Sequence, residues 1–191
     1  MAFIESISEE AATGEAGAIY AEARTAKGHV PNYARAFGLR PAVYRAWQQL
    51  NTAIRTAGDL RRFELATFAA ARKLRSSYCA LAHGKILAER FFDASQVAAL
   101  PDGLSAADLA VMDLAEKVVT DATEVTKADI DRLRSLGLRD EEILDVILAA
   151  AARCFFSKTL DALGVQPDSE YRKLVPVLRD ALTVGRPIES T

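Results

Sequence analysis

Hydrophobic residues recur along the chain at intervals of three and four positions, which is the spacing that places side chains on one face of an α-helix. The clearest run covers residues 140–163 and opens with three acidic residues, which suit the positive end of a helix dipole. Gly164 and Pro167 follow the run and supply a stop. Its apolar stripe comprises Ile143, Ile147, Ala150, Ala151 and Cys154. This pattern predicts that Cys154 faces the core.

Other helices are predicted from the same periodicity and from helix-start signals. Ser105 precedes Asp108 and Thr126 precedes Asp129, so each pair places a capping hydroxyl and a carboxylate at a helix N-terminus near 106 or 127. No window alternates as a β-strand does, so the fold class is all-α. The tail after the last helix contains Gly and Pro and should be mobile or dock on another subunit. The remaining predicted helices cover 9–27, 41–57, 60–74, 77–91 and 169–183.

Composition and charge narrow the class of protein. The chain has 191 residues, half of them hydrophobic, which is enough for a single domain covering 1–191 with a sizeable core. Its formal net charge is -2 and it has no dense Lys/Arg cluster, so nucleic acid and anionic membranes are not expected partners. The longest apolar stretch, 146–152, is too short to cross a bilayer, and no targeting segment is visible.

The chain contains two cysteines, Cys79 and Cys154, which is too few for the disulfide framework of a small secreted domain. This usage fits a reducing compartment, and we expect a cytoplasmic protein. In such a compartment a thiol becomes redox-active when its surroundings stabilise the thiolate. One cysteine and two distant histidines do not have the spacing of zinc ligands, so neither a metal nor another cofactor is expected. His29 should be an exposed loop residue.

The most informative cluster of polar side chains surrounds Cys79. Ser76, Cys79 and His83 are separated by three and then four residues, so a helix places all three on one face and the thiol beside the imidazole. If Ser76 or Ser77 caps this helix, Cys79 lies in its first turn, where free backbone N–H groups and the dipole favour the thiolate. Three basic residues just before the helix would add to this effect: Arg72, Lys73 and Arg75.

A carboxylate on the preceding helix would complete a proton relay. Glu64 would orient His83, and His83 would take the proton of the Cys79 thiol. The arrangement requires the helix of Glu64 to fold back beside the next one, which a short break between the two helices would permit. Each residue also has a plainer interpretation, because an isolated helical cysteine is usually a packing residue and Glu64 alone would pair with Arg61 or Arg62.

The order and spacing of these residues resemble the alkylhydroperoxidase D-like (AhpD-like, or carboxymuconolactone decarboxylase) family. Its signature is Glu, eleven residues, and then Cys-x-x-Cys-x-x-x-His, and the matching positions here are Glu64, Ser76, Cys79 and His83. The similarity is to the peroxidase-related branch and extends over most of the chain. The resemblance implies an AhpD-like helical bundle that assembles as a homo-oligomer, a trimer or a hexamer, with its site near the subunit contacts.

The same resemblance implies a chemistry and exposes a departure from it. In the family, the second motif cysteine attacks a hydroperoxide and the first resolves the sulfenic acid as a disulfide, so Cys79 would attack, with His83 as base and Glu64 orienting it. Ser76 departs from this pattern, because a serine forms no disulfide. Oxidised Cys79 would then need an external thiol or Cys154 as reductant, unless the scaffold serves other chemistry or the serine is an engineered replacement.

Three functions are therefore open. The first is a peroxidase-related thiol enzyme with antioxidant activity, which uses a small-molecule hydroperoxide and a thiol reductant. The second is proton-transfer chemistry of the lactone decarboxylase kind, in which Glu64 and His83 act on a small carboxylated ring; a pocket that offers Arg or Lys to the carboxylate would favour it. The third is a non-catalytic oligomeric protein, binding or stress-associated, in which the motif survives for packing.

Overall fold

The computed structural model describes residues 2–190, which form ten α-helices and two short 3₁₀ segments and contain no β-strand. The all-α prediction is confirmed. In chain order the elements are α1 Gly14–Lys27, α2 Asn32–Phe37, α3 Pro41–Ala57, α4 Leu60–Lys73, α5 Ser77–Arg90, α6 Ala94–Ala99, α7 Ala106–Asp121, η1 Ala122–Glu124, α8 Lys127–Ser135, α9 Asp140–Ala162, η2 Ser169–Lys173 and α10 Pro176–Leu182. In this part of the chain we find no helix whose length and apolar character would let it cross a lipid bilayer.

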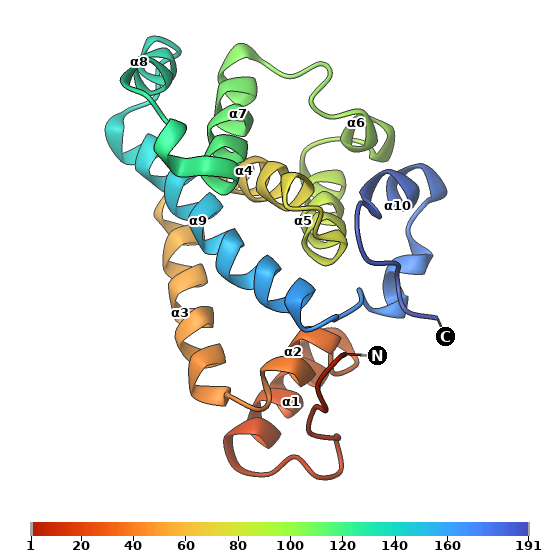
Figure 1. Ribbon diagram of the computed structural model, residues 1–191. Coiled ribbons are helices and arrows are strands. Elements are labelled where there is room, and N and C mark those ends of the chain that lie inside the picture. Colours follow the sequence, from red (N-terminus) through yellow and green to blue (C-terminus); the bar gives the residue numbers. More distant parts are fainter. Residues whose placement is uncertain (1, 191) are drawn as a thin grey trace.

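Helix α4 lies at the centre of the bundle and packs against α5, α7 and α9 (Figure 1). Every residue from Phe63 to Ala71 is buried, and a helix buried all round is stable only when other elements surround it. Four of these nine residues are alanines, whose small side chains let the neighbouring helices come close. The helix starts after Asp59, whose carboxylate accepts a hydrogen bond of 2.7 Å from the backbone N–H of Arg62.

A tight reversal between α4 and α5 sets the two helices side by side. Arg75 adopts the left-handed backbone conformation, with φ of 56°, and the Ser76 N–H donates to the Ala71 carbonyl at 2.9 Å. Gly185 covers this turn, where a Cβ atom would lie only 1.9 Å from the Arg75 carbonyl oxygen, so no residue with a side chain fits. The predicted fold-back of the Glu64 helix beside the next one is confirmed.

The tail after α10 packs on its own chain, which contradicts the prediction that it is mobile. Its docking on another subunit stays a prediction. The Gly185 N–H donates to the Ser77 hydroxyl at 2.7 Å, and the Glu189 N–H donates to the Pro167 carbonyl at 3.0 Å. Arg172 Nε adds a bond of 2.8 Å to the Glu189 carbonyl. These contacts hold the tail against the start of α5 and against the segment that contains Pro167 and Arg172.

Capping residues place several helix starts as predicted. The Ser105 hydroxyl accepts from the Asp108 N–H at 3.1 Å, and the Thr126 hydroxyl accepts from the Asp129 N–H at 3.4 Å. Helix α3 has the predicted bounds. Each of these helices begins at a residue whose side chain or backbone suits the free N–H groups of a first turn.

Other helix boundaries differ from the predictions. The helix predicted at 9–27 begins only at Gly14. The one predicted at 169–183 is divided into η2 and α10, because Pro176 suits the first position of a helix but not its interior. Helices α2 and α6 were not predicted, because six residues span less than two turns and show too little periodicity.

The buried face of α9 also differs from the predicted stripe. Cys154 is half-buried and packs against the edge of the core, so the prediction that it faces the core is confirmed in part, whereas Ala151 is exposed. Arg153, the preceding residue, takes the inward position and is only 4% exposed. A buried arginine requires partners for its charge, and these lie on α3 and α5. The residues of α9 that are buried are Ile143, Val146, Ala149, Ala150, Ala152, Arg153, Phe156, Ser157 and Leu160.

Candidate functional site

Three ionisable side chains meet in the core, one each from α4, α5 and α9. His83 Nδ1 lies 2.6 Å from Glu64 Oε2, and Arg153 Nη1 lies 3.0 Å from His83 Nε2. Glu64 is 0% exposed, His83 9% and Arg153 4%. A guanidinium only donates hydrogen bonds, so Nε2 is the acceptor; Nδ1 therefore carries the imidazole proton and donates to Glu64. The sequence-predicted contact between Glu64 and His83 is present.

The surroundings of His83 keep its imidazole neutral. Burial is the largest effect and lowers its pKa, because a low-dielectric interior disfavours the charged ring, and the Arg153 guanidinium lowers the pKa further. Glu64 opposes these effects without cancelling them. The Thr67 hydroxyl also lies 3.2 Å from Nδ1. A neutral imidazole with an unprotonated Nε2 is the form that can accept a proton.

Cys79 lies beside these residues, in the first turn of α5 as predicted. Its side chain is buried, and Sγ is 3.7 Å from Arg153 Nη1, the nitrogen that also contacts His83 Nε2. Arg153 therefore bridges the thiol and the imidazole. A positive charge next to a thiol favours the thiolate, so this position suits a nucleophilic cysteine.

The Arg153 guanidinium is held by groups from α3 and α9. Its Nη2 donates to Asn51 Oδ1 at 3.3 Å, and its carbon lies 5.4 Å from the ring centres of both Trp47 and Phe156. A cation over aromatic rings is stabilised by the negative ring faces. The sequence interpretation missed Arg153. A signal was nevertheless present, because this arginine continues the helical spacing of the buried positions of α9.

The basic residues that were predicted to act on Cys79 make their contacts elsewhere. The cation in contact with the Cys79 sulfur is instead Arg153, from a distant part of the chain. The contacts are Arg72 with the Leu100 carbonyl, Lys73 with Glu116, and Arg75 with the Val184 carbonyl.

Glu64 does not pair with the neighbouring arginines of its own helix. Arg61 binds Asp108, and Arg62 binds Glu142. The nearest cation besides the site itself is the partly exposed Arg55 of α3, whose Nε is 3.8 Å from Glu64 Oε1. The plainer interpretation of Glu64 as a solvated surface partner is therefore wrong, and its carboxylate belongs to the buried cluster.

Ser76 occupies the backbone N-cap position of α5 and is fully buried, but its hydroxyl makes no capping hydrogen bond. The Ser77 hydroxyl is engaged by the Gly185 N–H. Cys79 and Cys154 are both free thiols. Neither serine therefore caps the N-terminus of α5 through its side chain. The dipole of α5 still favours a negative charge on Cys79, which lies in the first turn.

The histidines are not arranged as metal ligands. Both ring nitrogens of His83 are engaged, Nδ1 by Glu64 and Nε2 by Arg153. His29 lies apart, with Nε2 4.0 Å from the Asp168 carboxylate. Within residues 2–190, no three His, Cys, Asp or Glu side chains come close enough together to hold a metal ion.

Neither a protein-family model nor a curated protein matches the sequence. Solved structures do match. One is an alkylhydroperoxidase AhpD core, an uncharacterised peroxidase-related protein from Ralstonia eutropha, with a TM-score of 0.77 and 25% identity; the match covers 89% of this chain and 94% of that chain. Another is a peroxidase-related protein from a Silicibacter species, with a TM-score of 0.76, 20% identity and coverage of 85% and 89%.

A third structure is the debrominase Bmp8, as a cysteine-to-alanine variant in complex with 2,3,4-tribromopyrrole. Its TM-score is 0.75 at 14% identity, and the match covers 95% of this chain and 100% of that chain. At such low identity the likeness to the debrominase, as to the Silicibacter protein, lies in the fold alone.

The fold and the buried cluster thus define an all-α protein of the AhpD-like class. More particularly, a peroxidase-related AhpD core, at 25% identity, is among the structures that the chain resembles. The resemblance that the sequence suggested is confirmed, as is the all-α fold that it implied.

The charge balance around His83 can be tested by titration. Replacing Arg153 with Met keeps an apolar side chain between Trp47 and Phe156 but removes the positive charge. The midpoint of the His83 titration should then rise, because Glu64 remains and the opposing cation is gone. NMR of the imidazole signals measures this directly, with His29 as an internal reference.

Arg55→Met is the matched control for this titration. Arg55 also lowers the pKa of His83, but its effect is the smallest of those acting on the ring. The control should therefore raise the midpoint less than Arg153→Met does. An unchanged or lowered midpoint in Arg153→Met would contradict the assigned charge arrangement.

Proposed function

We propose that the protein is a peroxidase-related thiol enzyme in which Cys79 reacts with a small-molecule hydroperoxide. One observation carries the proposal: Arg153 Nη1 lies 3.7 Å from the Cys79 sulfur and 3.0 Å from His83 Nε2, the unprotonated ring nitrogen. A single cation thus stabilises the thiolate and keeps a proton acceptor beside it. The AhpD-like fold supports the same reaction class.

Each step of the proposed reaction uses one of these residues. Cys79 gives its proton to His83 Nε2, directly or through one water molecule, and Glu64 balances the positive ring. The thiolate attacks the terminal peroxide oxygen, so an S–O bond forms while the O–O bond breaks. The alkoxide leaves with the electron pair and takes the proton from His83. The products are Cys79 sulfenic acid and an alcohol.

Ser76 determines how the enzyme would return to its starting state. A serine cannot condense with a sulfenic acid to form a disulfide, and Cys154 lies off the inward face of α9. We therefore propose an external thiol reductant. One thiol condenses with the sulfenic acid to form a mixed disulfide and releases water, and a second thiol attacks that disulfide, so that Cys79 leaves as a thiol and the two external thiols form a disulfide. A reducing compartment such as the cytoplasm supplies such thiols.

A second function is favoured by the presence of a guanidinium at the site. Proton transfer on a small carboxylated ring would use Glu64 and His83, with Arg153 binding the carboxylate. The debrominase Bmp8, which shares the fold, was crystallised with a small ring compound, 2,3,4-tribromopyrrole. We favour the thiol enzyme, because Arg153 already contacts His83, Asn51 and Cys79. If the protein is a proton-transfer enzyme, Cys79→Ala should leave its activity in place. If the protein is non-catalytic, the substitution has no activity to remove.

Mass spectrometry of the peroxide-treated protein tests the proposal. With cumene hydroperoxide and a sulfenic-acid probe, Cys79 should be labelled in the unaltered protein and in Cys154→Ala, which is the matched control. Glu64→Gln should slow the labelling about 10²-fold, because the proton acceptor loses its orienting carboxylate. Absence of a label on Cys79 at every pH where the protein stays folded would refute the thiol enzyme. A peptide linked through Cys79 and Cys154 would refute the external reductant alone.

We propose further that copies of the chain associate through an exposed apolar face of α3 and α9, which are neighbours in the fold. A cluster of exposed hydrophobic side chains of this kind marks an interaction site. The same two helices carry Asn51 and Arg153, so the site would lie close to the subunit contact, as the family resemblance implies for a trimer or hexamer. The large hydrophobic residues exposed on this face are Val43, Leu50, Leu144, Leu148 and Phe155.

Two variants of equal exposure test this association. Leu144 on α9 and Val177 on α10 are each 52% exposed. Leu144→Glu should shift the protein toward monomers in sedimentation velocity, because it places a charge in the contact. Val177→Glu should leave the sedimentation coefficient unchanged. A monomeric unaltered protein, or equal behaviour of the two variants, would contradict the proposed face.

A further inference from the structure

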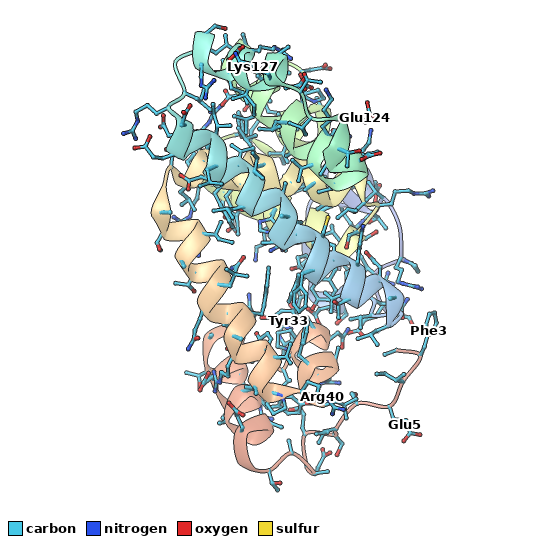
Figure 2. The ribbon with its side chains drawn as sticks, turned by 60° about the vertical axis from the view of Figure 1, so that its left-hand side comes forward. Phe3, Glu5, Tyr33, Arg40, Glu124 and Lys127 are labelled. Carbon is cyan, nitrogen blue, oxygen red and sulfur yellow. The ribbon has the colours of Figure 1, made fainter. Side chains whose placement is uncertain are left out.

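Helix α3 lies along the edge of the bundle, next to α9 (Figure 2), and two of its side chains connect the buried cluster with solvent. Asn51 and Arg55 are four residues apart on this helix, so they lie next to each other on one face. Asn51 contacts Arg153 and Arg55 contacts Glu64, which are the two charged ends of the cluster. The side chain of Arg55 is 43% exposed, so this pair can be reached from outside.

Both side chains keep hydrogen-bond donors that no other group uses. The Asn51 oxygen Oδ1 accepts from Arg153 Nη2, so the amide N–H groups point away from Arg153, and they have no partner among residues 2–190. Arg55 Nε lies 3.8 Å from Glu64 Oε1, which is an ion pair but too long for a hydrogen bond. The two terminal nitrogens of Arg55 have no partner in the same part of the chain. Several N–H groups on one face of α3 are therefore available to an acceptor.

The cluster has one positive charge in excess whenever Cys79 is neutral. Glu64 supplies one negative charge, Arg55 and Arg153 supply two positive charges, and the imidazole is uncharged. A Cys79 thiolate balances this excess before the peroxide reacts. The sulfenic acid formed by the reaction is neutral, so the excess returns at the stage when the reductant approaches. The oxidised site therefore attracts an anionic molecule more strongly than a neutral one.

The side of α3 that carries Arg55 is separate from the apolar face through which we propose that copies of the chain associate. Leu50 belongs to that face. Arg55 follows Leu50 by five residues, which at 3.6 residues per turn puts the two side chains roughly 140° apart around the helix axis. A second copy bound at Leu50 thus leaves the side with Arg55 open to a small molecule.

We propose that Asn51 and Arg55 bind a carboxylate of the external thiol, and hence that the reductant is an acidic thiol of low molecular weight. The inference rests on the proposed thiol function and names the chemical class of its reductant. The guanidinium and the amide N–H groups hold the carboxylate, because a planar pair of donors matches its two oxygens. The thiol attacks the sulfur of Cys79 sulfenic acid. An S–S bond forms, the S–O bond breaks, and the hydroxyl leaves as water with the proton of the thiol.

Reduction of oxidised Cys79 by glutathione and by its diethyl ester tests the proposal, because the ester has no free carboxylate. After one equivalent of cumene hydroperoxide, the loss of sulfenic-acid labelling is followed at increasing thiol concentrations. Glutathione should reduce Cys79 about three- to fivefold more slowly in Arg55→Met than in the unaltered protein, because one partly exposed ion pair is lost. The rate with the ester should change far less. Added salt should slow the reaction with glutathione but not that with the ester.

Arg35→Met is the matched control for these rates. The Arg35 side chain is 42% exposed and also pairs with a carboxylate, but it lies on α2 and its partner is Glu9. The control should leave the rates with both thiols unchanged. Equal slowing of the two thiols in Arg55→Met, or equal behaviour of the two arginine variants, would overturn the proposal.

Binding of S-methylglutathione to Cys79→Ala tests the carboxylate site without a redox step. The neutral alanine stands in for the neutral sulfenic acid, and the blocked sulfur of the ligand cannot react. The NMR signals of His83 should shift during the titration, and adding Arg55→Met should weaken the binding at least about threefold. A His83 signal that does not move, or binding that is equally strong without Arg55, would overturn the assignment.

The oxidation of Cys79 in the unaltered protein separates the two levels of the account. If peroxide does not oxidise Cys79, the thiol function itself fails, and the reductant assignment fails with it. If oxidation is normal but Arg55→Met does not distinguish glutathione from its ester, only the reductant assignment fails.

Discussion

The structure depends on one buried chain of hydrogen bonds, from the Glu64 carboxylate through the His83 imidazole to the Arg153 guanidinium. An isolated buried charge is costly, but here a neutral ring joins two opposite charges by donating to one and accepting from the other. Loss of Glu64 would leave the buried Arg153 charge without a carboxylate, at a cost of about 3–5 kcal/mol. Because these residues come from α4, α5 and α9, the chain of bonds holds three helices in one arrangement.

The chemistry of Cys79 is tied to the same interaction. Arg153 completes the chain of buried charges and is also the cation beside the sulfur, so stability of the core and reactivity of the thiol share one residue. The turn at Arg75, covered by Gly185, sets the start of α5 and hence the position of Cys79. Ser76 at that start leaves the thiol without a partner in its own motif, so under the proposed function the reducing step requires a second molecule.

Local signals predicted much of the fold and part of the site. A helix cap such as Ser105 and the spacing of Glu64, Cys79 and His83 each involve residues that are close together in the sequence. The helix starts and the contact between these side chains could therefore be predicted from the sequence. The role of Arg153 was not predicted because an arginine next to a stripe of apolar residues is expected to face solvent. Its buried position is explained only by its partners on other helices. The same limit applies to Cys154, which lies half-buried at the edge of the core.

The tautomer of His83 at neutral pH tests the central claim most directly. ¹⁵N NMR of the imidazole distinguishes a protonated from an unprotonated ring nitrogen without altering any residue. The account predicts a neutral ring with the proton on Nδ1, where it is donated to Glu64, and a bare Nε2 that accepts from Arg153. A proton on Nε2, in either a neutral or a charged ring, would contradict it, because the guanidinium would then face a donor.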